Sequence, residues 1–150
     1  MPALTRILVP VDFSPCSQAA LEYATFLAQP YGASIDVLHA WQPTVHTWEP
    51  LAGGLDDSLL GVEREAVAHE LGNLLAGTDH ERVHARIECG NTRQIILAVA
   101  ERDHYDLIVM GTHGRTGLSR ILSGSISELV VRRASCPVVT VHLPAVEART

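Results

Sequence analysis

The chain has 150 residues, of which 47% are hydrophobic and 19% are charged, and its formal net charge at pH 7 is −6. This length is enough for one domain with a sizeable core, and the acidic balance argues against nucleic acid or an anionic membrane as the main partner. All eleven residues counted as lysine or arginine are arginine. The absence of lysine excludes a P-loop lysine, a Schiff-base lysine and the strand lysine of kinases.

The cysteines and the N-terminal segment predict a cytoplasmic protein. Cys16, Cys89 and Cys136 are odd in number and form no C-x-x-C pair, which predicts free thiols in a reducing compartment, each with a buried structural role. The first residues lack the charged and apolar regions of a signal peptide, and no apolar run reaches membrane-spanning length. We therefore expect no membrane association.

The first strand and helix are predicted close to the N-terminus. Residues 6–12 predict a first strand, because residues 7–11 form a continuous apolar run, as expected of a parallel strand covered on both faces. Pro10 cannot donate a ladder hydrogen bond, so the strand should loosen there. Ser14 and Pro15 then supply an N-cap and a first helical residue. This helix should run to about Gln29.

The middle of the chain alternates between strand and helix patterns. Residues 34–41 predict a second strand, and residues 42–57 a long irregular connection that is either functional or mobile. Residues 59–76 have helical apolar spacing. The polar and apolar alternation of residues 82–89 predicts an edge strand, and residues 91–104 predict another helix.

The C-terminal part completes the series. Residues 106–110 predict a buried strand, residues 125–133 a helix, and residues 137–143 a last strand. Strand and helix thus alternate along the whole chain without a linker or an internal repeat. The predicted fold class is α/β: one domain over residues 1–150, with a doubly wound, Rossmann-like sheet of five parallel strands in the order 3-2-1-4-5.

This strand order predicts where a ligand would bind. The winding reverses between the first and fourth strands, and ligands of such sheets occupy the crevice at that switch point. Residues 10–14 and 111–117 flank the crevice. Asp12 lies just past the first strand, where its carboxylate would accept hydrogen bonds from ribose hydroxyls or hold a metal. It is equally suited to a structural role as a negative charge at a helix start.

A glycine pattern follows the fourth strand. Gly111, Gly114, Gly124 and Ser125 form the spacing Gly-x2-Gly-x9-Gly-Ser. Glycines leave backbone N–H groups accessible, and the following helix start adds more N–H groups and a positive dipole end, so the two pieces are suited to the phosphates of one nucleotide. The structural alternative is ordinary turn glycines and a capping box made by Ser125 and Glu128.

The spacing is similar to the signature of the ATP-binding branch of the universal stress protein family. Residues 7–14, 38–40 and 136–141 also resemble that family, so the resemblance covers nearly the whole chain. It implies an ATP-binding protein of the stress response. It also implies a homodimer, for which the apolar strand 137–143 is a natural pairing edge.

The resemblance also implies the site. Pro10, Val11, Asp12 and the backbone of Ala40 would border adenine and ribose. Arg115 has the planar guanidinium that forms paired bonds to phosphate, while His113 would either reach a phosphate or be solvated. The expected nucleotide-binding residues are Pro10, Val11, Asp12, Ala40, Met110, Gly111, His113, Gly114, Arg115, Gly124, Ser125, Ile126 and Ser127.

The chemistry of the site favours binding over turnover. No paired carboxylates, nucleophile–base pair or lysine lie near the signature, so fast phosphoryl transfer lacks its usual groups. The histidines have no zinc-ligand spacing, whereas a Mg²⁺ that bridges phosphates fits the pattern. We expect a regulatory protein that changes conformation or assembly when ATP binds. A slow ATPase or nucleotide-transferring enzyme, and a scaffold that keeps the motif without using it, remain as alternatives.

Overall fold

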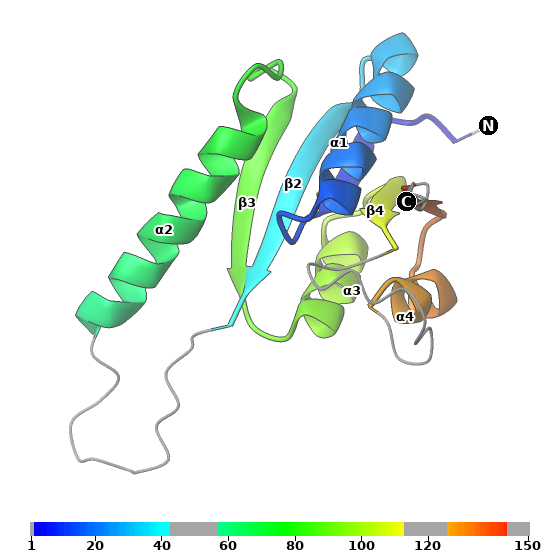
Figure 1. The fold of residues 1–150 in the computed structure, drawn as a ribbon. Helices are drawn as coiled ribbons and strands as arrows, with labels where there is room; N and C mark the ends of the chain where they lie inside the picture. The colour runs from blue at the N-terminus through cyan, green and yellow to red at the C-terminus, as the bar shows by residue number, and fades with distance from the viewer. Residues whose placement is uncertain (1, 43–56, 113–125, 144–150) are drawn as a thin grey trace, which may run out of the picture.

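The computed structural model describes residues 2–42, 57–112 and 126–143. Five parallel strands form one sheet in the order β3-β2-β1-β4-β5 (Figure 1), which confirms the predicted fold class and strand order. The strands are β1 (Arg6–Pro10), β2 (Ser34–Trp41), β3 (Val83–Cys89), β4 (Leu107–Gly111) and β5 (Val138–Val141). The helices are α1 (Pro15–Ala28), the short 3₁₀ helix η1 (Gln29–Tyr31), α2 (Asp57–Leu75), α3 (Thr92–Arg102) and α4 (Ile126–Arg133).

The helices flank the sheet on both faces, and each face has its own apolar core (Figure 1). Successive residues of a strand point to opposite faces. Ile7 and Val9 therefore pack in the cluster that contains the buried residues of α1 and α2, whereas Leu8 packs in the cluster of α3 and α4. Burial on both faces explains why the β1 sequence is continuously apolar.

Helix starts and stops follow the local sequence signals. The Ser14 side chain accepts a hydrogen bond from the Ser17 N–H at 3.1 Å and caps α1. Gly32, with a φ of 65°, ends the helical segment after η1. The Asn91 side chain caps α3 by accepting from the N–H groups of the second and third helical residues. These boundaries depend on neighbouring residues, and sequence therefore predicts them well.

Some element ends differ from the predicted ones. The first strand ends at Pro10 rather than at residue 12, and the last strand covers Val138–Val141 rather than residues 137–143. The third helix ends at Arg102, because His104 has a φ of 53° and its N–H takes part in the turn that closes the helix.

The cysteines are free thiols, as predicted. Cys16 is buried and Cys136 is half-buried, but Cys89 is exposed. The expectation of a buried role for every cysteine was therefore wrong for Cys89, which lies at the end of the edge strand β3.

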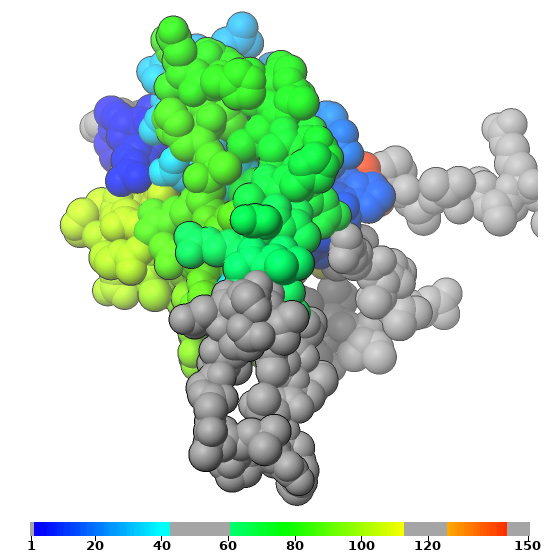
Figure 2. Space-filling model, turned by 90° about the vertical axis from the view of Figure 1, so that its left-hand side faces the viewer, coloured from blue at the N-terminus to red at the C-terminus, as the bar shows by residue number. Residues whose placement is uncertain are grey.

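Helix α2 covers the β3 side of the molecule. Figure 2 shows it in green over much of that surface. Leu71 and Leu75, near its C-terminal end, are buried, whereas Val62 in its N-terminal half is 65% exposed. No helix among the described residues has the length and apolar character needed to cross a membrane.

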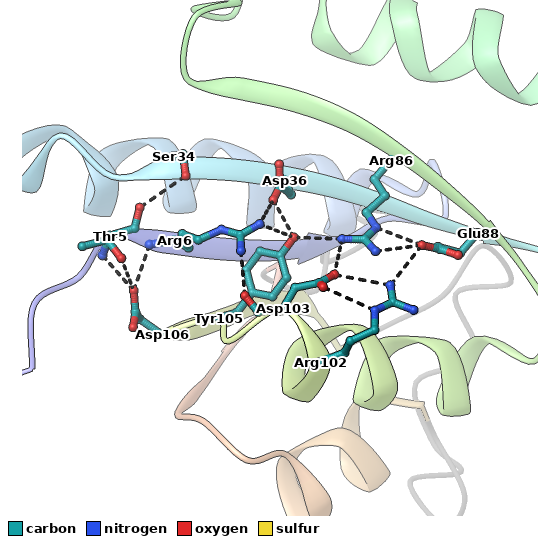
Figure 3. Close-up of polar contacts among 10 residues, drawn as sticks. All are labelled: Thr5, Arg6, Ser34, Asp36, Arg86, Glu88, Arg102, Asp103, Tyr105 and Asp106. Carbon is teal, nitrogen blue, oxygen red and sulfur yellow. Dashed lines mark hydrogen bonds and ion pairs between the residues drawn. The ribbon is translucent and has the colours of Figure 1, made fainter.

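A charged cluster lies across β3 and the end of α3 (Figure 3). The Arg86 guanidinium forms ion pairs with Glu88 at 2.8 Å and with Asp103 at 2.6 Å. Arg102 bonds to the same two carboxylates. Because these pairs join α3 to an edge strand, they help to hold the helix against the sheet.

The same cluster continues toward β1 (Figure 3). The Tyr105 hydroxyl donates to Asp36 at 2.5 Å, and the Arg6 guanidinium lies 4.5 Å from the centre of the Tyr105 ring. Burial, reinforced by the hydrogen bond to Asp36, raises the pKa of Tyr105 to about 12. The phenol is therefore a permanent donor at neutral pH.

Candidate functional site

A cavity of about 290 Å³ lies at the carboxyl ends of β1, β2 and β4. Here the winding of the sheet reverses, which is where the strand order predicted a ligand site. The cavity is lined by Pro10, Val11, Asp12, Ser17, Leu38, Ala40, Thr92, Arg93, Ile96, Met110, Gly111, Thr112, Ile126 and Ser127.

Pro10 ends the pairing of β1 with β4. The Val11 N–H donates to the Leu38 carbonyl at 2.8 Å, so Val11 faces β2. Backbone groups of successive strand residues point to alternate sides, and Pro10 therefore faces β4, where proline has no N–H to donate. The register between β1 and β4 accordingly stops at Leu8↔Ile108. This is the loosening that the sequence predicted at Pro10, and it opens the sheet at the switch point.

Two peptide units lie beside the end of β1, one on each of its neighbouring strands. Ala40 on β2 faces the same side as Leu38, whose carbonyl binds β1, so its N–H and C=O point toward the end of β1. Gly111 on β4 also faces β1, because the N–H of its neighbour Thr112 points the other way and donates to Val141 on β5 at 3.1 Å. Both strands thus present main-chain donors and acceptors to one cavity.

The cavity wall is apolar on the α3 side. Leu38, Ile96 and Met110 line it, and each is at most 5% exposed. All three belong to the core cluster under α3 and α4, so their positions are fixed by packing. An apolar wall beside peptide edges fits a flat ring that has hydrogen-bonding groups on its rim.

Three helices begin at the cavity. Ser17 in the first turn of α1, Thr92 at the start of α3, and Ile126 and Ser127 at the start of α4 all contribute to the lining. This follows from the fold, because a helix that follows a parallel strand begins near that strand's carboxyl end. The positive ends of the helix dipoles favour an anionic group in or beside this cavity.

Asp12 and Arg93 are the charged residues of the described lining. The Asp12 Oδ1 accepts from the Ser14 N–H at 3.0 Å. Asp12 therefore binds the backbone just before the start of α1 and also borders the cavity. Arg93 was not predicted. The signal for it was Asn91, which starts a helix directly after a strand and so places Arg93 at the carboxyl edge of the sheet.

Gly111 has a packing role that the sequence interpretation did not include. A Cβ atom at this position would lie 2.8 Å from the Cys16 carbonyl carbon and 3.0 Å from the Ser17 nitrogen, both in the backbone of α1. Glycine is therefore needed for α1 to pack on β4, independently of any ligand.

The structure brings together every predicted site residue that it describes. These residues are Pro10, Val11, Asp12, Ala40, Met110, Gly111, Ile126 and Ser127. The predicted residues that lie outside the described part are His113, Gly114, Arg115, Gly124 and Ser125. Lining residues that the sequence interpretation missed are Ser17, Leu38, Thr92, Arg93, Ile96 and Thr112.

Comparisons with known proteins agree with this architecture. The sequence model of the universal stress protein family matches residues 3–142. The universal stress protein MJ0531 of Methanocaldococcus jannaschii is 32% identical over 144 residues, which cover 95% of this chain and 84% of that protein.

Solved structures show the same fold. The universal stress protein UspA from Lactobacillus plantarum superposes with a TM-score of 0.71 at 27% identity, covering 94% of this chain and 99% of the other. A universal stress protein family protein from Arabidopsis thaliana with AMP bound has a TM-score of 0.62 at 22% identity, covering 95% and 94%. This chain therefore belongs to the universal stress protein family.

Proposed function

We propose that this chain is a cytoplasmic, single-domain protein that binds an adenine nucleotide, ATP in particular, in the switch-point cavity. Binding then changes its conformation or assembly in a stress response. The observation that carries the proposal is the pair of peptide units, Ala40 and Gly111, that face one apolar-walled cavity. The family member with AMP bound supports it, because that protein has the same fold.

The base and ribose fit the described lining. An adenine ring has apolar faces and a rim of donors and acceptors, which match the wall of Ile96 and Met110 and the peptide groups of Ala40. The Asp12 carboxylate accepts hydrogen bonds only, so it suits the ribose hydroxyls.

The phosphates belong at the helix starts. The first turn of α4, with Ile126 and Ser127, borders the cavity, and Arg93 adds a permanent positive charge. We assign the remaining phosphate contacts to residues 113–125, which carry the glycine signature.

We expect a Mg²⁺ to bind together with the phosphates of the nucleotide. Within residues 2–42, 57–112 and 126–143, no three histidine, cysteine or acidic side chains gather in a way that could hold a metal. Asp12 is the carboxylate that the described lining offers. One carboxylate suits a Mg²⁺ held mainly by phosphate oxygens and water.

We further propose that the protein is a homodimer paired through β5. This strand lies at an edge of the sheet, and its residues are half-buried and apolar apart from Thr140. An apolar edge with unpaired peptide groups is a template for a second strand.

Calorimetric titration of nucleotide-free protein tests the binding. We expect ATP to bind, and Asp12→Asn to weaken binding about tenfold or more, because a hydrogen-bonded charge is lost. Asp79→Asn is the matched control, since Asp79 Oδ1 accepts from the Glu81 N–H at 3.0 Å in a turn like that of Asp12, but lines a different cavity. Absence of heat with ATP, ADP and AMP, or equal effects of the two variants, would contradict the proposal.

A further inference from the structure

The imidazole of His39 binds the backbone carbonyl of Val11, a residue that lines the cavity. Its Nδ1 lies 2.9 Å from the Val11 oxygen. A carbonyl oxygen can only accept, so Nδ1 carries the hydrogen and donates it. His39 is on β2 and Val11 follows β1, and the bond therefore links two strands just where their pairing ends.

This bond takes the place of a rung of the sheet. The last backbone bond between the two strands runs from the Val11 N–H to the Leu38 carbonyl at 2.8 Å. In a parallel ladder the next bond would run from the Ala40 N–H to the Val11 carbonyl. The register ends one residue earlier, at Pro10↔Leu38, and that rung is not among the backbone bonds of the described residues. The imidazole holds the carbonyl that Ala40 would otherwise bind.

The turn that follows is strained, and His39 supports it. Phe13 has a φ of 63°, which is unfavourable for a bulky side chain. His104 has a similar φ, but it closes the end of α3, where this conformation is common. No helix ends at Phe13. Its ring packs on the His39 ring, with centroids 4.7 Å apart, and against the core. Packing on His39 thus helps to hold the conformation that carries Asp12 to the cavity.

We propose that His39 is a positioning residue for the base of the bound nucleotide. By taking the Val11 carbonyl out of the ladder, it leaves the N–H and C=O of Ala40 directed into the cavity. A peptide unit that offers one donor and one acceptor on the same side matches the adjacent ring nitrogen and amino group of adenine. This inference rests on the proposed nucleotide binding, and it adds a residue that lies behind the site rather than in its lining.

Two amide variants distinguish the effect of losing the hydrogen-bond donor from the effect of losing the imidazole ring. In His39→Asn the amide nitrogen lies at the same bond distance from Cβ as Nδ1, so it can still reach the Val11 carbonyl. In His39→Gln the amide lies one bond further out, near the place of Nε2, and the bond is lost. We expect His39→Asn to keep the Kd for ATP within about threefold, and His39→Gln to raise it about tenfold.

The ratio of ATP to ITP affinity tests the assigned role. ITP is inosine triphosphate, whose base has a ring N–H donor and a carbonyl acceptor where adenine has a ring nitrogen acceptor and an amino donor. The Ala40 peptide group would match only adenine, so wild-type protein should prefer ATP. We expect His39→Gln to lose most of this preference and His39→Asn to retain it. A role limited to stability would weaken binding of both nucleotides equally.

Hydrogen exchange of the Ala40 amide tests the same bond without any nucleotide. In the free wild-type protein this amide should exchange fast for a residue inside a strand, because it lacks its rung. In His39→Gln the Val11 carbonyl becomes available, and we expect Ala40 exchange to slow by about tenfold as the rung forms. If His39→Gln folds poorly, His39→Phe, which keeps a ring to pack on Phe13 but has no donor for the Val11 carbonyl, should show the same loss of base preference.

The outcomes separate the two proposals. Wild-type protein that binds no adenine nucleotide would refute the proposed function, while Ala40 exchange would still report on the His39 bond. If ATP binds, but the folded variants keep both the wild-type ATP to ITP ratio and the wild-type Ala40 exchange, His39 has no positioning role.

Discussion

At the scale of single residues, Gly111 shows how one position serves both packing and the site. Its backbone faces the cavity, and its missing Cβ lets the α1 backbone approach within contact distance. The nearest atoms belong to the main chain, which cannot move aside as a side chain can. Packing by itself is thus a sufficient reason for glycine at this position.

Gly111→Ala should therefore destabilise the fold. The new methyl group would lie 2.8 Å from the Cys16 carbonyl carbon, and overpacking of this kind costs about 1–3 kcal/mol. Gly72→Ala is the control, because Gly72 is an exposed residue of α2 and a Cβ there would meet nothing within 4 Å. Gly72→Ala should raise the free energy of unfolding by about 0.5–1 kcal/mol. Urea denaturation measures both, and a Gly111→Ala protein as stable as wild type would contradict the packing argument.

At the scale of elements, Asp106 joins β1 to β4 at the amino ends of these strands, opposite the cavity at their carboxyl ends. Its Oδ2 accepts from the Thr5 N–H at 2.9 Å, the Thr5 hydroxyl at 2.8 Å and the Arg6 N–H at 2.9 Å. The hydrogen bonds from Thr5, foremost the backbone one, lower the pKa of Asp106 below its usual value of 3.8. The Asp106 carboxylate thus links β1 and β4 at their amino ends, whereas the pairing of these strands stops at Pro10 near their carboxyl ends.

This arrangement predicts an acid dependence of stability. Because the folded pKa of Asp106 is below the unfolded value, its contribution is complete above about pH 4 and is lost as pH falls through the folded pKa. Asp106→Asn should lower the free energy of unfolding near pH 7 and flatten its decline in acid. The exposed Glu81→Gln is the control. Urea denaturation from about pH 7 to about pH 2 measures the slope, and identical slopes for wild type and Asp106→Asn would refute this role.

At the scale of the whole molecule, the free edge of β5 decides how two copies could pair. The Thr112 N–H donates to the Val141 carbonyl, so Val139 and Val141 direct their peptide groups to β4. By alternation, the N–H and C=O of Thr140 face the open edge. A second β5 strand would have to use them.

Thr140→Pro should therefore dissociate the proposed dimer and leave the fold intact. Proline removes an N–H that faces outward, which is tolerated on an edge strand, and it sacrifices no bond to β4. Thr140→Val keeps the N–H and the side-chain shape, so it should remain dimeric. Light scattering at micromolar concentration measures the mass. A dimeric Thr140→Pro protein, or monomeric wild type, would exclude pairing through this edge.

The sequence by itself determined the order of the elements, the parallel sheet and most helix boundaries of this universal stress protein. Apolar periodicity and caps such as Ser14 and Asn91 act between neighbouring residues, so they can be read locally. Pro10 belongs to the same class, because a missing N–H is a property of one residue. The switch point followed from the strand order, and with it the general location of the cavity.

Tertiary structure decided what depends on contacts between distant segments. Arg93 reaches the cavity because α3 starts at the same sheet edge as β1 ends, Gly111 is required because α1 crosses it, and His39 matters because its ring meets Val11. The local sequence pattern does not show the contacts of Gly111 or His39, and the Asn91 cap places Arg93 in the first turn of a helix without showing which strand ends beside it. Each requires knowing which strands are neighbours and to which side every peptide group points, and only the assembled sheet supplies that information.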